Sequence, residues 1–179
     1  LAAYAALDSG ISFIAPLPMP VDEYRKDFTT LESLNEFNEL LGKAEAWFEL
    51  PLPEVSKNEE LVKEKGNRVE RYYNVGSYIA MHSQLLIALW DGIDEEKRGG
   101  TANIVSLKRK GFSTPDHPVR QRLNEFQSGT VCHILTPRIS IPAPADAFSR
   151  KMIYSDYWGM DETQAMEMDR QLLSHIDGY

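Results

Sequence analysis

Apolar and polar positions alternate along this chain in short blocks, and the blocks predict strands and helices in turn. Continuous apolar runs of strand length end at prolines or polar turns. These runs predict strands at 11–18, 46–50, 85–91 and 130–137. Other stretches place apolar residues three and four positions apart, which is typical of a helix with one buried face. Helices are predicted at 1–7, 21–28, 31–44, 67–83, 101–110 and 161–176, with a shorter helical stretch near 119–127.

Two of these helices carry a clear apolar face, and the segment between them is polar. The predicted buried face of the helix at 31–44 consists of Leu31, Leu34, Phe37, Leu40 and Leu41. That of the helix at 67–83 consists of Val69, Tyr72, Tyr73, Gly76, Ile79 and Ala80. Residues 54–67 are predicted to form a surface loop, and Asp161 is predicted to cap the last helix.

The strand at 85–91, LLIALWD, has no alternation of apolar and polar residues, so both of its faces are expected to be covered, as in a parallel sheet. The succession of strand, helix and strand predicts an α/β fold. The expected form is a Rossmann-like, doubly wound, mainly parallel sheet with helices on both faces. This domain is assigned to residues 1–137, with the strand at 130–137 as its last strand. Residues 138–179 are expected to form an irregular arm and a C-terminal helix.

Composition narrows the class of protein. The chain has 179 residues and a formal net charge of −8, which opposes non-specific binding to nucleic acid or to an anionic membrane. A single cysteine, Cys132, excludes a disulfide framework and favours a reducing compartment, so a cytoplasmic location is expected. The four histidines lack ligand spacing, and neither a metal nor a cofactor is expected. Because the opening helix has no capping residue before Leu1, the chain is expected to start inside a larger fold.

Residues 85–111 combine the features of an anion site. A buried strand ends at Trp90-Asp91-Gly92, and Gly99-Gly100-Thr101 opens the next helix. Glycines allow close approach of the backbone, and a helix N-terminus favours phosphate. The N–H groups of Gly100, Thr101 and Ala102 are therefore expected to hold a phosphate, with a charge-assisted hydrogen bond from Arg98. The alternative is a glycine turn with Thr101 as an ordinary helix cap.

Charge is concentrated around this segment. Residues 97–122 carry a net charge of +6, so the rest of the chain carries −14. One basic region on an acidic protein suits a small anionic ligand. The three cations at 108–110 also have a simpler explanation, because cations at the end of a helix complement its dipole. That explanation leaves Lys97 and Arg98, beside the helix start, unaccounted for.

The motifs ALWDG (88–92) and RGGTANIV (98–105) resemble those of the SLOG superfamily, whose Rossmann-like members include the "lonely guy" phosphoribohydrolases and the DNA-processing protein family. The strand and loop IAPLPMPVDEYRKDF (14–28) is also similar. The resemblance implies a nucleotide-binding sensor domain for a phosphorylated nucleoside or an NAD-derived nucleotide. The site residues expected on this basis are Trp90, Asp91, Gly92, Arg98, Gly99, Gly100, Thr101, Ala102 and Pro18. Because a further strand precedes the first helix in such proteins, the sheet is expected to lack its first strand here.

One departure from the family pattern separates sensor from enzyme. The phosphoribohydrolases carry Gly-Gly-x-Gly-Thr-x-x-Glu, and the position of that glutamate is Ile104 here, which can neither donate nor accept a proton. No catalytic residue is therefore assigned. The alternative is a nucleoside 5′-monophosphate N-glycosidic hydrolase or transferase in which Asp91, Asp94 or Glu95 substitutes. A third possibility is an interaction domain with a vestigial pocket. The resemblance also implies a bacterial sensor linked through 138–179 to an effector or a second copy, in antiphage defence.

Overall fold

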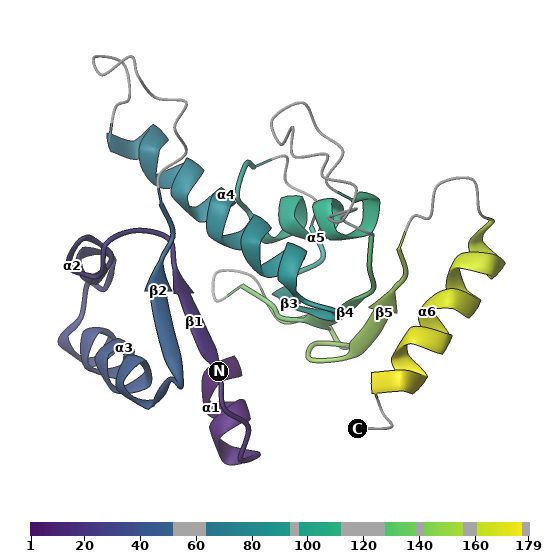
Figure 1. Cartoon of the computed structure of the whole chain (residues 1–179), viewed down its shortest axis with the longest axis horizontal. Helices are drawn as coiled ribbons and strands as arrows, with labels where there is room; N and C mark the ends of the chain where they lie inside the picture. The colour runs from purple at the N-terminus through teal and green to yellow at the C-terminus, as the bar shows by residue number, and fades with distance from the viewer. Residues whose placement is uncertain (52–63, 94–96, 112–127, 139–141, 156–160, 177–179) are drawn as a thin grey trace. The chain divides into compact units, whose positions relative to one another are not determined.

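The computed structural model describes residues 1–51, 64–93, 97–111, 128–138, 142–155 and 161–176. These described residues form a mixed α/β arrangement with two small sheets, and the chain divides into two compact units, Leu1–Val75 and Gly76–Tyr179 (Figure 1). The helical stretch predicted near 119–127 lies outside the described residues. So do Asp94, Glu95 and the predicted loop residues 54–63.

The first unit contains a parallel pair of strands. β1 (Ile14–Leu17) lies beside β2 (Ala46–Glu49), with Ile14 opposite Ala46. The helices of this unit are α1 (Ala2–Asp8), α2 (Val21–Tyr24), the 3₁₀ helix η1 (Arg25–Asp27), α3 (Leu31–Lys43) and the first part of α4 (Glu64–His82). Gly10 has a φ of +69°, and it ends α1 in the left-handed conformation that glycine adopts readily.

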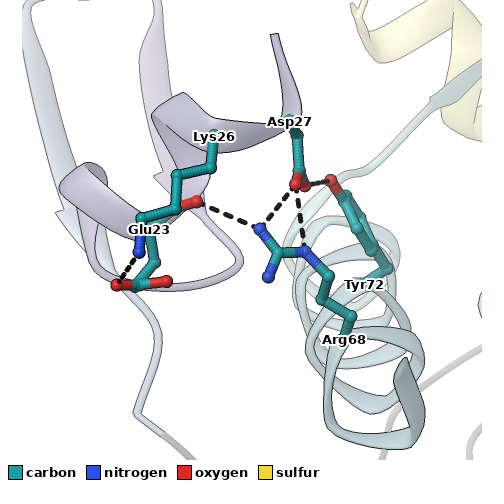
Figure 2. Close-up of polar contacts among 5 residues, drawn as sticks. All are labelled: Glu23, Lys26, Asp27, Arg68 and Tyr72. Atoms are coloured by element: carbon teal, nitrogen blue, oxygen red, sulfur yellow. Dashed lines mark hydrogen bonds and ion pairs between the residues drawn. The ribbon is translucent and has the colours of Figure 1, made fainter. Parts of the chain in front are cut away.

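A polar cluster joins η1 to α4 in this unit. Figure 2 shows Arg68 and Tyr72 of α4 directed at the carboxylate of Asp27. Arg68 Nε and Nη2 donate to Asp27 Oδ1 at 3.0 and 2.5 Å, and Tyr72 donates to Oδ2 at 2.5 Å. Arg68 also donates to the carbonyl of Glu23 at 3.1 Å.

An aromatic group lies beside this polar cluster. The rings of Tyr24, Phe28 and Phe37 pack on one another, with centroids between 4.6 and 5.4 Å apart. The ring of Tyr72 lies 6.2 Å from that of Tyr24, between centroids. Both charge and ring packing therefore fix α4 to the α2–η1 turn.

The second unit contains a three-stranded mixed sheet. β3 (Leu86–Trp90) and β4 (Val131–Leu135) are parallel, with Trp90 opposite Leu135. α5 (Thr101–Lys110) connects them, so the segment is a β–α–β unit, and α5 packs on both strands (Figure 1). β5 (Arg150–Ile153) pairs antiparallel with β4, and α6 (Glu162–Ile176) follows.

Buried residues show how this unit is held together. Its apolar core includes Ala80, Leu86, Ala88, Val105 and Val131. A Cβ added at Gly76 of α4 would lie 2.7 Å from Cγ1 of Ile104, so the glycine lets α4 approach α5 closely. The ammonium of Lys108 is buried and donates to the carbonyls of Ala80 and Ser83 at 3.1 and 2.5 Å. Lys108 is thus a cap for the end of α4, so complementing the dipole at the exposed end of α5 does not by itself explain this cation.

Several sequence predictions need correction. β4 is not the last strand, because β5 lies within the segment predicted to be an irregular arm. The predicted loop at 54–67 is wrong from Glu64 onward, where α4 has already begun. Three residues assigned to buried helix faces are exposed instead: Leu31 (75%), Val69 (37%) and Ile79 (42%). Ile87 of β3 is 60% exposed, so the described residues cover one face of that strand and not both.

Among the described residues, β1 pairs with β2 and β3 pairs with β4. An additional strand beside them stays a prediction, as does a domain boundary at residue 137. In the described part of the chain, no helix is long and apolar enough to cross a membrane.

Candidate functional site

The parallel pairing of β3 and β4 brings three separate segments to one edge of the sheet. Asp91 follows β3, Thr136 and Arg138 follow β4, and the N-terminus of α5 lies at the same edge. In open α/β sheets, ligands bind beyond the carboxyl ends of the strands. A pocket of about 330 Å³ lies here, a size typical of small-ligand sites. It is lined by Leu89, Trp90, Asp91, Ile93, Lys97, Gly100, Thr101, Ala102, Thr136 and Arg138.

The start of α5 offers backbone donors to this pocket. Gly100 is the N-cap residue and has no side chain to accept from the first turn. The N–H groups of Thr101, Ala102 and Asn103 are the ones that an N-cap side chain or an anion usually satisfies. The N–H of Gly100 donates to the carbonyl of Lys97 at 2.9 Å, so this donor is already used, contrary to the sequence prediction. The phosphate expected here would therefore bind the next N–H groups along the helix.

The glycines before α5 serve the turn itself. Gly99 has a φ of +75°, which favours glycine, and its N–H donates to Asn103 Oδ1 at 3.2 Å. A Cβ added at Gly100 would lie 3.1 Å from the carbonyl oxygen of Lys97. Substitution of Gly100 would thus strain the turn whether or not a ligand binds.

Asp91 is the one acidic residue among those that line the pocket, and its side chain is only 9% exposed. Oδ1 accepts from the N–H of Ile93 at 3.1 Å, which shapes the turn after β3. Oδ2 forms an ion pair with Nε of Arg138, whose side chain is 44% exposed. The carboxylate is therefore held from two sides, by the turn after β3 and by the guanidinium of Arg138. Sequence reasoning missed Arg138 because it is 47 residues from Asp91 along the chain.

The indole of Trp90 is fixed in place beside the pocket. Its Nε1 donates to the carbonyl of Ile93 at 3.0 Å, and its ring lies 5.0 Å from that of His133, between centroids. His133 Nε2 is 2.9 Å from the carbonyl oxygen of Trp90, so it carries the proton, because a carbonyl can only accept. Together with Leu89 and Ile93, the indole gives the pocket an apolar wall.

The structure brings together five of the nine residues expected from the sequence: Trp90, Asp91, Gly100, Thr101 and Ala102 all line the pocket. Gly92 (φ +79°) and Gly99 shape its turns without lining it. Arg98 is exposed and is not among the lining residues, whereas its neighbour Lys97 is. Pro18 is buried in the first unit, and its part in the site stays a prediction.

A larger hollow of about 650 Å³ lies in the first unit, between residues of α1 and α3. It is lined by Tyr4, Leu31, Glu32, Asn35, Glu36 and Glu39. Three carboxylates without a lining cation oppose the binding of an anion. The site beside α5 therefore fits the expected chemistry better, although it is smaller.

Comparisons with known protein families, curated proteins and solved structures give no match to this chain. The geometry of the pocket is therefore the basis for assigning a function. Within the described residues, no group of three or more histidine, cysteine or acidic side chains could hold a metal ion.

Proposed function

We propose that the pocket beside α5 binds a phosphorylated nucleoside or an NAD-derived nucleotide, and that the chain is a nucleotide-binding sensor domain. The observation that carries the proposal is the meeting of a helix N-terminus, two cations (Lys97 and Arg138), a buried carboxylate and an apolar wall in one pocket. Phosphate fits the N–H groups and the cations, and the flat aromatic face of a base fits beside Trp90 and Ile93. The proposed SLOG-like, doubly wound sheet accords with this place at the carboxyl ends of parallel strands.

Binding without cleavage is supported by the surroundings of Ile104. Its side chain is buried and fills the space left by Gly76, so this position faces α4 rather than a ligand. A carboxylate here would be buried against the neighbouring helix. We propose that no base is released from the bound nucleotide, and that the ligand acts as a signal to an attached or partner effector.

Titration calorimetry with AMP, GMP, CMP and cyclic ADP-ribose isomers tests the proposal. At least one nucleotide should bind, and chromatography should detect no free base after prolonged incubation. If the wild type releases base well above the level of an Asp91→Asn variant, the chain is a hydrolase and not a sensor. If no nucleotide binds, an interaction domain becomes the better interpretation.

A matched pair of variants locates the binding. Lys97→Ala removes a cation that lines the pocket, and the affinity should fall by about tenfold, or ~1.4 kcal/mol. Lys110→Ala removes the same charge at the other end of α5, about 13 Å from Thr101 at ~1.5 Å per residue, and should leave the affinity nearly unchanged. Equal losses would mean that binding depends on diffuse charge and not on this pocket.

A further inference from the structure

We infer that Asp91 and Arg138 form a latch that makes the pocket selective for ligands with both an anion and sugar hydroxyls. The inference rests on the proposed function and deepens it. Asp91 Oδ2 is closed off from solvent, and its ion-pair partner is Nε of Arg138. Asp91 Oδ1 is held by the N–H of Ile93. In the proposed latch, a ligand donor reaches Oδ2 when Arg138 moves away from it.

A ligand that has only an anion, or only hydroxyl groups, would bind weakly, because it replaces one side of the ion pair and leaves the other without a partner. An anion that draws Arg138 away leaves a carboxylate that is only 9% exposed without its counter-charge, which is costly. A hydroxyl alone cannot compensate for the guanidinium that it displaces. A phosphorylated ribose supplies both partners: the phosphate pairs with Arg138, and the 2′- and 3′-hydroxyls donate to Asp91. The pair then separates without leaving a buried charge unmatched.

The exposure of the two side chains sets which of them moves. The side chain of Arg138 is 44% exposed and that of Asp91 is 9% exposed, so in the proposed latch the guanidinium moves and the carboxylate stays in place. In this inference Asp91 stays in place and accepts hydrogen bonds from the sugar hydroxyls, and Arg138 moves to pair with the phosphate. The class of ligand that fits is a ribonucleotide rather than a 2′-deoxynucleotide or a free phosphate.

The experiment compares AMP with 2′-deoxy-AMP, CMP with 2′-deoxy-CMP, and inorganic phosphate, in the wild-type chain and in Asp91→Asn. In the wild type, each ribonucleotide should bind about tenfold more tightly than its deoxy form. The Asp91→Asn variant carries a neutral amide, which accepts more weakly and does not hold Arg138. The ratio should therefore fall toward one, while inorganic phosphate binds severalfold more tightly because the competing negative charge is gone.

The outcomes separate the inference from the proposed function. An unchanged ribose-to-deoxyribose ratio in Asp91→Asn, with every ligand weakened equally, would overturn the latch and leave the pair as a scaffold for the loops. Failure of every phosphate compound to bind the wild type would overturn the proposed function and the latch together. Arg138→Lys provides a second variant that keeps the charge. It should retain phosphate binding and alter the ribose preference by less than Asp91→Asn does.

Discussion

Replacement of Asp27 by asparagine tests the polar cluster that ties η1 to α4 (Figure 2). The substitution keeps the shape of the side chain and removes the charge that accepts from Arg68 and Tyr72. Hydrogen bonds to charged groups contribute about 1.5–3 kcal/mol each, and partial exposure reduces this contribution. The side chains of Asp27 and Arg68 are 27% and 26% exposed. We expect the free energy of unfolding to fall by about 2 kcal/mol at pH 7.

The effect should depend on pH in a defined direction. Partial burial alone would raise the pKa of Asp27, but hydrogen bonds from Arg68 and Tyr72 outweigh it and lower the pKa. An unfolded aspartate titrates at about 3.9. The stabilisation is therefore fully present above about pH 4 and is lost as the pH falls through the lower, folded-state pKa. Burial and the bond to Asp27 raise the pKa of Tyr72, so the phenol stays protonated and keeps donating throughout this window.

Urea denaturation of the wild type and of Asp27→Asn, followed by circular dichroism at pH 7, 5 and 3, measures the difference. Asp22→Asn is the matched control, because Asp22 is 85% exposed and pairs with Arg25 on the surface. The control should lose less than about 0.5 kcal/mol. Equal losses in the two variants, or a difference between wild type and Asp27→Asn that does not shrink on acidification below pH 4, would refute this account of the cluster.

Two further predictions concern the packing of α4 and α5. Gly76→Ala should destabilise the chain by about 1–3 kcal/mol, because the added methyl group overlaps the side chain of Ile104. Ile104→Ala in the same chain should recover part of that loss. Thermal unfolding of the double variant should therefore show a smaller loss of stability than the sum of the two single losses. Lys108→Met should lower the free energy of unfolding by about 2 kcal/mol, because the carbonyls of Ala80 and Ser83 lose a buried donor. The control is Lys110→Met, at the exposed end of α5. It should change the free energy of unfolding by less than about 0.5 kcal/mol. Similar effects at Lys108 and Lys110 would argue against the buried cap.

Helix boundaries were accessible to sequence reasoning where a local cap defines them. The predicted bounds of α5, Thr101–Lys110, agree with the structure, because Gly100 and Gly111 flank a continuous helical pattern. Asp161 caps α6 as predicted: Asp161 Oδ1 accepts from the N–H of Gln164 at 2.8 Å. Gln164 accepts in return from the N–H of Asp161 at 3.2 Å, which completes a capping box. These interactions involve residues only three positions apart, so the sequence pattern contains them.

Features set by partners elsewhere in the chain were not accessible in this way. β5 has the sequence Arg-Lys-Met-Ile, in which two charged residues interrupt the apolar pattern, as is common on edge strands. Its strand conformation comes from pairing with β4, where Ile153 lies opposite Val131. Lys108 likewise follows an ordinary helix-end pattern, and only the approach of α4 turns it into a buried cap. The sequence around β5 does not indicate its pairing with β4, and the sequence around Lys108 does not indicate its contact with α4.

The candidate site combines both kinds of information, which explains why its sequence prediction is partial. Trp90, Asp91 and the turn at 100–102 are contiguous with β3 and α5, so a local motif could indicate them. Arg138 joins them only because β4 runs parallel to β3 and ends at the same edge. The same register places Arg138 against Asp91, whose Oδ2 is closed from solvent. The ligand selectivity proposed here therefore depends on the pairing of two strands. A change that shifted their register by one residue would separate the latch while leaving every residue of the local motif in place.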